Sequence, residues 1–341
     1  MTYIPETDIS LLKKRTEEAG NIVIITHHNP DGDAIGSALG LYHILCRQSK
    51  TVSVLVPNQL PEFLQWMPGF GMIRYYKNEA AAVCKILGEA GLVIMLDFND
   101  PSRLGKMEEC LKHISCPVVL IDHHPNPEVK AEVCISFTEV SSTAELVYET
   151  AEAAGWTNHI NYDAATCLFT GLLTDTISFT VNASRPRTFE IAAALLRFGI
   201  PKDEINRLVF NAFSENRMRL MGHLLTHNMV VLHQYKTAYI TLSLEDAKKY
   251  GFQTGDSEGF VNYPLYIKGI IFSAFIMERK DHIKLSFRSR GNFAVNTIME
   301  QHFRGGGHLN AAGGEVYGST MQEVTDKLVS VLPLYHELCE S

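Results

Sequence analysis

Hydrophobic residues in the first half of the chain follow two alternating patterns. Short, continuously apolar and β-branched runs are typical of strands that a parallel sheet buries on both faces. Longer stretches with an apolar residue every three or four positions are typical of amphipathic helices. The expected strands span 22–25, 52–56, 92–96 and 118–121, and the expected helices span 9–19, capped by Thr7 or Asp8, 34–45, 103–113, 142–154 and 162–173. This alternation predicts an α/β domain with a mostly parallel sheet.

The pattern changes near Pro186, where mostly helical sequence begins and continues to about Thr226. Beyond it, we expect two strand pairs and two helices, at 230–242, 270–288, 293–301 and 321–332. Such a mixture predicts a second, smaller mixed α/β domain. The expected organisation is therefore a parallel-sheet domain over 1–195, a helical linker over 196–228 and the smaller domain over 229–341.

Composition and charge narrow the class of protein. The chain has 341 residues, 46% of them hydrophobic and 20% charged, which suits a globular protein of two domains. We see neither a membrane-spanning run nor a secretion signal, so we expect a cytoplasmic protein without a membrane partner. The seven cysteines are scattered, and neither a disulfide framework nor a structural zinc site is expected. A net charge of −8 argues against binding to long nucleic acid but allows a local basic pocket.

Carboxylates and imidazoles gather where the expected strands end. The carboxyl ends of parallel strands meet at one edge of a sheet, where ligands bind. The groups at this edge are His27 and His28 with Asp31 and Asp33, then Asp97, then Asp122, His123 and His124, and finally Asp175 at the end of a helix. Taken singly, each group has a commoner explanation as a turn, a helix cap or a hydrogen-bonded histidine. Taken together, so many carboxylates repel one another unless cations neutralise them.

The donor types indicate which cation. Carboxylates with a few imidazoles and no thiolate suit manganese, magnesium or iron better than structural zinc. Two such metals about 3.5–4 Å apart, bridged by a carboxylate, can bind both oxygens of an in-line phosphoryl displacement and lower the pKa of a bound water. The sequence therefore predicts a two-metal phosphoesterase.

These motifs resemble the DHH phosphoesterase superfamily. The resemblance is carried by His27-x-x-Pro30-Asp31-x-Asp33-x-x-Gly36-Ser37, Asp97, Asp122-His123-His124, Asp175 within GLLTDT, Ser286-Phe287-Arg288-Ser289-Arg290 and Gly305-Gly306-Gly307-His308. The motifs occur in family order over nearly the whole chain, and the last two resemble the DHH-associated domain. The stand-alone arrangement is similar to the nano-RNase subgroup, whose members degrade oligoribonucleotides of a few residues and often dephosphorylate 3′-phosphoadenosine 5′-phosphate.

The resemblance implies a role for each residue at the sheet edge. One metal is held by His27, Asp31 and Asp97, and a second by Asp33, Asp97, His123 and Asp175, with Asp97 as the bridge. His124 faces the substrate phosphate, and Asp122 orients a neighbouring imidazole. Manganese is the expected metal, with magnesium, cobalt or iron as alternatives. His28 has no role in the resemblance and fits an ordinary surface residue.

The second domain supplies candidate substrate-binding groups. Arg288 can present a bidentate fork to phosphate oxygens. The glycines Gly305, Gly306 and Gly307 let backbone amides approach an anion, and His308 adds a donor beside them. A flexible turn is the simpler explanation for glycines alone. Arg290 and Arg304 are weaker candidates. We expect the active site in a cleft between the two domains.

Several functions stay open at this point. The favoured one is hydrolysis of short RNA oligonucleotides and small nucleotides, and a homodimer is compatible with it. A cyclic or linear di-adenylate phosphodiesterase is an alternative within the superfamily. An inorganic pyrophosphatase or exopolyphosphatase is disfavoured by the Gly-Gly-Gly-His segment. A catalytically silent nucleotide-binding module would be indicated by a missing metal ligand, and the motifs lack none.

Overall fold

The computed structural model describes residues 4–253 and 255–339, apart from the side chain of His308. The chain forms two compact units, Met1–Ala212 and Phe213–Ser341. Within the described ranges, no helix is both long enough and apolar enough to cross a membrane.

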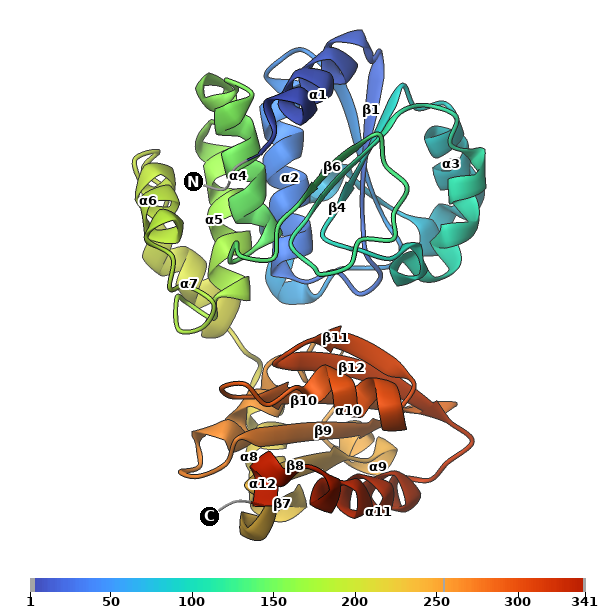
Figure 1. Cartoon of the computed structure of the whole chain (residues 1–341), viewed down its shortest axis with the longest axis vertical. Coiled ribbons are helices and arrows are strands. Elements are labelled where there is room, and N and C mark those ends of the chain that lie inside the picture. The colour runs from blue at the N-terminus through green and yellow to red at the C-terminus, as the bar shows by residue number, and fades with distance from the viewer. Residues whose placement is uncertain (1–3, 254, 340–341) are drawn as a thin grey trace. The chain divides into compact units, whose positions relative to one another are not determined.

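The first unit is built on a parallel sheet of six strands in the order β3-β2-β1-β4-β5-β6 (Figure 1). Its strands are β1 (Asn21–Thr26), β2 (Thr51–Val56), β3 (Ile73–Tyr75), β4 (Leu92–Leu96), β5 (Val118–Asp122) and β6 (Val133–Ser136). The strand order reverses between β1 and β4, which is the point where open α/β sheets bind their ligands. The sequence predicted the four longer strands and missed the two short ones at the sheet edges, β3 and β6.

Helices cover both faces of this sheet, which explains why its strands are continuously apolar. One face packs against α1 (Glu6–Glu18), α2 (Gly32–Cys46), α4 (Thr143–Ala153) and α5 (Tyr162–Asp175), and the other against α3 (Tyr76–Gly88) and the 3-10 segment η3 (Pro101–His113). In β1, the side chains of Ile22 and Ile24 pack in the core on the face covered by α2. Those of Val23 and Ile25 pack in the core on the face covered by α3. Side chains of a strand alternate between its faces, so burial on both sides requires apolar residues throughout.

Two local expectations for the first unit were wrong, and one helix was missed. Helix α1 begins earlier than expected, at Glu6, and its N-cap residue is Pro5 instead of Thr7 or Asp8. The segment expected as a helix over 103–113 is a 3-10 segment that breaks at Gly105, where φ is 55°. Glycine adopts this left-handed conformation without steric cost, so the apolar periodicity alone did not reveal the break. Helix α3 was not predicted at all.

A disulfide bond, also not expected from the sequence, joins Cys84 of α3 to Cys110 of η3, with their Cα atoms 4.9 Å apart. The two cysteines are 26 residues apart along the chain, and packing of α3 and η3 on the same face of the sheet brings them together. The described part of the chain thus holds a single bridge, while Cys46, Cys116, Cys134, Cys167 and Cys339 are free thiols.

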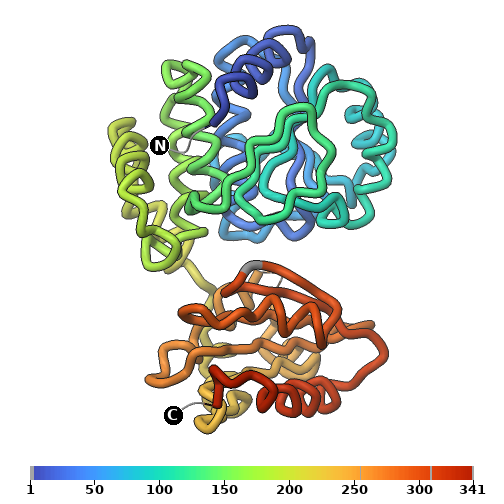
Figure 2. Tube along the Cα trace, in the orientation of Figure 1, coloured from blue at the N-terminus to red at the C-terminus, as the bar shows by residue number. Residues whose placement is uncertain are grey.

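The second unit contains a mixed sheet of six strands in the order β11-β12-β10-β9-β8-β7. Its strands are β7 (Met229–Leu232), β8 (Thr237–Leu242), β9 (Phe272–Glu278), β10 (His282–Ser289), β11 (Gly305–His308) and β12 (Ala311–Tyr317). Among the described strand pairs of this second sheet, only β8 and β9 are parallel, and the others are antiparallel. Helices α10 (Val295–His302) and α11 (Met321–Val331) pack on one face, as the chain trace in Figure 2 shows. The mixed α/β architecture agrees with the prediction.

The helices that follow the first sheet in the sequence and precede the second pack in two different cores. Helices α6 (Pro186–Leu196) and α7 (Lys202–Phe210) contribute apolar side chains to the first unit, and α8 (Glu215–His223) contributes Leu220 to the second. Packing therefore assigns these helices to one unit or the other. The predicted three-part division, with its boundaries at 195/196 and 228/229, stays a prediction.

Helices α2 and α5 approach each other closely because glycines face each other where they meet. A β-carbon on Gly36 would lie 2.6 Å from the carbonyl oxygen of Cys167 and 2.6 Å from the backbone nitrogen of Gly171. Backbone atoms cannot move aside as a flexible side chain can, so this contact requires glycine at position 36. The two helices carry Asp33 and Asp175, and their separation therefore sets the distance between these carboxylates.

We predict that Gly36→Ala lowers the free energy of unfolding by about 1–3 kcal/mol, because the added methyl group overpacks the contact between α2 and α5. The matched control is Gly222→Ala in α8, where nothing lies within 4 Å of the added β-carbon. Alanine is the better helix former by up to about 1 kcal/mol, so this control should be neutral or stabilising. Urea unfolding of the metal-free proteins measures both. A Gly36→Ala protein as stable as the wild type would contradict the packing argument.

Candidate metal centre

The structure brings the acidic and imidazole residues of the sheet edge together at the carboxyl ends of three neighbouring strands. His27 follows β1, Asp97 follows β4, Asp122 ends β5 and is followed by His123 and His124, Asp31 and Asp33 lie at the start of α2, and Asp175 is the last residue of α5. These positions belong to five separate elements. The edge lies at the reversal of strand order between β1 and β4, as expected for a ligand site in such a sheet.

A first group of donors surrounds the ring of His27. Its Nε2 lies 3.5 Å from Oδ2 of Asp97 and 4.0 Å from Oδ2 of Asp31. Its Nδ1 donates a hydrogen bond of 2.9 Å to the backbone carbonyl of His28, so the lone pair of the neutral ring lies on Nε2. This Nε2 is buried and makes no hydrogen bond with any described residue. A buried nitrogen in this state, facing two carboxylates, is suited to bind a cation.

Asp31 caps helix α2 and also faces the first group of donors, and its role as a metal ligand stays a prediction. Its Oδ1 caps helix α2 by accepting hydrogen bonds of 3.0 Å from the backbone N–H groups of Asp33 and Ala34. Its Oδ2 is the oxygen that faces His27. The cap fixes the orientation of the carboxylate, and the second oxygen is thereby directed into the site.

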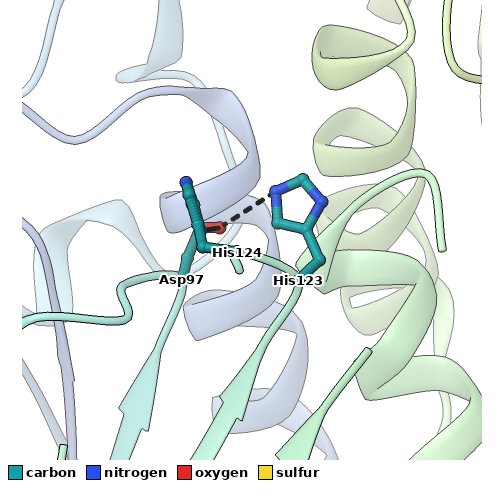
Figure 3. Close-up of side chains that lie close together, drawn as sticks. All are labelled: Asp97, His123 and His124. Atoms are coloured by element: carbon teal, nitrogen blue, oxygen red, sulfur yellow. Dashed lines mark ion pairs between the residues drawn. The ribbon is translucent and has the colours of Figure 1, made fainter. Parts of the chain in front are cut away.

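A second group of donors surrounds the ring of His123. Its Nε2 lies 3.4 Å from Oδ2 of Asp175, 3.7 Å from Oδ1 of Asp97 and 3.9 Å from Oδ2 of Asp33. Figure 3 shows Asp97 beside the rings of His123 and His124. The two oxygens of Asp97 thus face different histidines, since Oδ2 faces His27 and Oδ1 faces His123. Asp97 is shared between the two groups, as a bridging carboxylate must be.

His124 has a different environment. Its Nδ1 donates a hydrogen bond of 2.7 Å to Oδ1 of Asp122, whose side chain is fully buried. This contact holds the imidazole ring in one orientation. The same Nδ1 lies 3.8 Å from Oδ1 of Asp97. Because Nδ1 carries the proton of the hydrogen bond to Asp122, only Nε2 of His124 could contact a cation. The predicted task of His124 at a substrate phosphate stays a prediction.

Burial and charge act in opposite directions on the two innermost carboxylates. Burial raises the pKa of Asp33 well above its ordinary value, and the negative charges of Asp97, Asp175 and Asp31 raise it further. Burial also acts to raise the pKa of Asp97, but the contact with His27 and the charges of the neighbouring imidazoles outweigh it and lower this pKa. The cluster therefore shifts the two pKa values in opposite directions, favouring the ionised form of Asp97 and the protonated form of Asp33.

The same carboxylates shift the pKa values of the imidazoles. Burial acts to lower the pKa of His27, but its contacts with the carboxylates of Asp97 and Asp31 raise it overall. Burial likewise acts to lower the pKa of His123, but the charges of Asp175 and Asp97 raise it overall. Without a cation, protons thus neutralise part of the negative charge, and a cation would replace them.

The donors fit divalent cations in type and in spacing. Neighbouring ligands of one small divalent cation lie about 3–3.5 Å apart, because each metal–oxygen bond is about 2.0–2.2 Å long. The separations between 3.4 and 4.0 Å around His27 and His123 require only a small contraction. Oxygen and nitrogen donors without sulfur favour manganese, magnesium or iron. Three overlapping sets of described residues lie close enough together to hold a cation: His27, Asp31 and Asp97; Asp33, His123 and Asp175; and Asp97, His123 and His124. Asp97 belongs to two of these sets.

Helix α4 also contributes to this site, which the sequence did not predict. The hydroxyl of Thr143 donates a hydrogen bond of 2.8 Å to Oδ1 of Asp97, and both oxygens of Asp33 accept hydrogen bonds from backbone N–H groups of α4. The run Ser141-Ser142-Thr143 before an apolar stretch is a helix-start signal that could have directed attention there. It does not reveal which residues lie opposite, because Asp33 and Thr143 are 110 positions apart.

The substrate-binding candidates of the second unit occupy strands β10 and β11. Arg288 lies on β10 opposite Ala311 of β12. The glycines form strand β11, not a flexible turn, and a β-carbon on Gly305 or Gly307 would lie 2.2–2.3 Å from carbonyl oxygens of β12. Strand packing thus explains these two glycines without a ligand, while a β-carbon on Gly306 would meet only a side-chain oxygen, at 3.8 Å. The side chain of His308 lies outside the described residues.

An α/β fold with acidic and imidazole groups at its sheet edge that could hold cations defines a broad class, the metal-binding α/β proteins. Comparison with known protein families identifies the group within that class. The N-terminal domain of the DHH family matches residues 21–172, and the DHHA1 domain matches residues 234–333. The chain belongs to the DHH family of phosphoesterases.

Three relatives illustrate the range of this family. The chain is 31% identical to the bifunctional oligoribonuclease and PAP phosphatase NrnA of Thermus thermophilus, over 92% of this chain and 89% of that protein. It is 28% identical to the cyclic-di-AMP phosphodiesterase GdpP of Bacillus subtilis, over 96% of this chain but only 49% of GdpP. The crystal structure of an exopolyphosphatase-related protein from Bacteroides fragilis is 42% identical and superimposes with a TM-score of 0.95, covering 100% of both chains.

We predict that manganese binding releases protons and strengthens as the pH rises above the ordinary imidazole pKa of about 6.5, because the cation displaces protons from Asp33, His27 and His123, whose pKa values are raised. A raised pKa in the folded state stabilises the metal-free protein at low pH, and this stabilisation is lost as the pH rises through that pKa. The increase in melting temperature caused by manganese should therefore grow over the same range. Titration calorimetry in two buffers of different ionisation enthalpy counts the released protons. Binding without proton release would contradict the prediction.

Proposed function

We propose that this protein is a metal-dependent phosphoesterase that hydrolyses short oligoribonucleotides and 3′-phosphoadenosine 5′-phosphate. The observation that carries the proposal is the shared carboxylate of Asp97, whose two oxygens face two separate groups of metal donors. The similarity to NrnA over most of both chains supports the choice of substrate. Manganese is the proposed metal, with magnesium, cobalt or iron as alternatives.

The side chains of the first unit divide the work of hydrolysis. His27, Asp31 and Asp97 hold one cation, and Asp33, Asp97, His123 and Asp175 hold the other. When bound, two cations supply a nucleophile at neutral pH and neutralise charge that develops on the phosphoryl group. Asp122 fixes the ring of His124, which contacts a phosphate oxygen of the substrate.

The second unit binds the nucleotide in this proposal. Arg288 forms a bidentate contact to a phosphate, which a guanidinium makes more specifically than a lysine can. Gly306 is the glycine of β11 with the most open space, so its backbone is the most accessible to an anion. His308 would add a donor next to it. These contacts position the substrate and leave the nucleophile to the first unit.

Two alternative substrate classes each have an observation in their favour. The relative GdpP is a cyclic-di-AMP phosphodiesterase, although the chain spans only about half of its length. The Bacteroides fragilis protein of known structure is described as exopolyphosphatase-related. A DHHA1 domain over residues 234–333 favours a nucleotide over a bare polyphosphate in our interpretation.

A silent binding module is disfavoured because each position of the proposed metal site holds a competent donor. A cytoplasmic location and a homodimer stay predictions.

A substrate panel tests the proposal directly. The wild-type protein, loaded with manganese, is assayed on a diribonucleotide, a pentaribonucleotide, 3′-phosphoadenosine 5′-phosphate, cyclic di-adenylate, pyrophosphate and polyphosphate. We expect the highest kcat/KM on the short oligonucleotides and 3′-phosphoadenosine 5′-phosphate, and no activity after chelation. Asp97→Ala is the control for contaminating activity, and it should retain less than about a tenth of the turnover, a barrier increase of more than about 1.4 kcal/mol. A preference for cyclic di-adenylate or polyphosphate would replace the proposed substrate class.

A variant of Arg288 tests the division of labour between the units. Arg288→Ala should lower kcat/KM on nucleotide substrates roughly tenfold to a hundredfold, because a hydrogen bond to a charged group contributes about 1.5–3 kcal/mol. Hydrolysis of bis-p-nitrophenyl phosphate, which offers little for the second unit to bind, should suffer much less. The control is Arg219→Ala in the same unit, where the side chain is 68% exposed and pairs only with Glu215 among the described residues. Equal losses on both substrates would assign Arg288 to stability or metal binding instead.

A further inference from the structure

The first turn of helix α4 binds the carboxylate of Asp33. The backbone N–H of Thr143 donates to Oδ2 at 2.6 Å, and the backbone N–H of Ala144 donates to Oδ1 at 2.9 Å. The N-terminus of a helix carries unpaired N–H groups and a partial positive charge, both of which favour a carboxylate. Because each oxygen has its own donor, the carboxylate of Asp33 cannot rotate without breaking a hydrogen bond.

The side chain of Thr143 reaches the other carboxylate of the second donor group. Its hydroxyl donates a hydrogen bond of 2.8 Å to Oδ1 of Asp97, and both residues are almost fully buried. This is the oxygen that faces His123, whereas Oδ2 faces His27. The hydroxyl thus holds Asp97 in the orientation that shares its oxygens between the two groups. One residue thereby contacts both Asp33 and Asp97.

A buried network holds the start of α4 in place. Ser142 caps the helix by accepting a hydrogen bond of 3.0 Å from the backbone N–H of Glu145. The carboxylate of Glu145, fully buried, accepts hydrogen bonds of 2.8 Å from Arg185 and 2.8 Å from Thr188. On the opposite side, a β-carbon on Gly171 would lie 2.7 Å from the side chain of Ala144. The helix start therefore has little freedom to move away from the carboxylates.

We propose that Thr143 is a positioning residue that tunes the second metal site selectively. This inference rests on the proposed two-metal function. The second group, with Asp33, Asp97 and His123, depends on Thr143 through two carboxylates. The first group depends on it only through Asp97, since none of the hydrogen bonds found in the described chain joins α4 to His27 or Asp31. The hydroxyl donates to Oδ1 of Asp97, which faces His123 of the second group, and not to Oδ2, which faces His27 of the first. Its loss should therefore weaken the second cation site far more than the first.

The test compares three substitutions in the same helix. Thr143→Val keeps the shape of the side chain and removes the hydroxyl, while Thr143→Ser keeps the hydroxyl. The matched control is Thr150→Val, because Thr150 is buried in α4 and its hydroxyl has no hydrogen-bond partner among the described residues. The backbone hydrogen bonds to Asp33 persist in all three variants. Any difference between the two valine variants thus isolates the hydroxyl at position 143.

Titration of metal-free protein with manganese is the primary measurement. We expect two sites in the wild type and in Thr150→Val. In Thr143→Val, one site should weaken roughly tenfold to a hundredfold, the usual effect of removing a partner of a metal ligand, and the other should change little. Thr143→Ser should restore most of the lost affinity. At subsaturating manganese, kcat of Thr143→Val should fall with KM nearly unchanged, and added manganese should restore it.

Each outcome bears on a different claim. Two unchanged sites in Thr143→Val, or an equal loss in Thr150→Val, would overturn the positioning role and leave the proposed function intact. Equal weakening of both sites, or no recovery in Thr143→Ser, would also overturn it, since the effect would then be structural. A wild-type protein that binds a single cation and hydrolyses no nucleotide would refute the proposed function itself. Thermal unfolding of every variant confirms that each one is folded before titration.

Discussion

Repulsion between buried carboxylates is the constraint on which the first unit depends. Asp33 and Asp97 are only 1% and 2% exposed, and Asp31 and Asp175 add negative charge from nearby. Such a cluster is costly unless positive charge or hydrogen-bond donors compensate it. The structure supplies the imidazoles of the neighbouring strand ends and the N-terminus of α4. Protons or bound cations must neutralise the remaining negative charge, so folding, pH and metal binding are coupled at this site.

The need to hold these carboxylates in place accounts for the close packing of α2, α4 and α5 around them. Glycines at the contact of α2 and α5 let Asp33 approach the end of α5, where Asp175 lies. The start of α4 is held against Asp33 by hydrogen bonds that leave neither oxygen of that carboxylate free to turn. A site of this kind needs ligands held in place before the cation arrives, because rotation of a carboxylate would cost binding free energy. Rigid helices, not loops, therefore supply most of its supports.

In the second unit, the glycine motif was found in the sequence, but phosphate binding alone does not explain its glycines. The run Gly305-Gly306-Gly307 resembles a family motif, and we expected its glycines to admit a phosphate. In the structure, Gly305 and Gly307 lack side chains because strand β12 lies against them. Strand packing therefore accounts for two of the three glycines, and phosphate binding by this segment stays a prediction. Only at Gly306 among the three would a β-carbon fit without a clash, 3.8 Å from a side-chain oxygen.

The sequence by itself determined the parallel sheet, its longer strands and the residues at their ends, because burial on both faces demands continuously apolar runs and the chain direction places their polar ends at one edge. It did not predict the short edge strands β3 and β6, the break at Gly105 or the bridge between Cys84 and Cys110. Neither did it reveal that Thr143 contacts Asp97. These features depend on segments distant in the chain, and local patterns carry no information about which atoms meet after folding. Tertiary packing alone decided them.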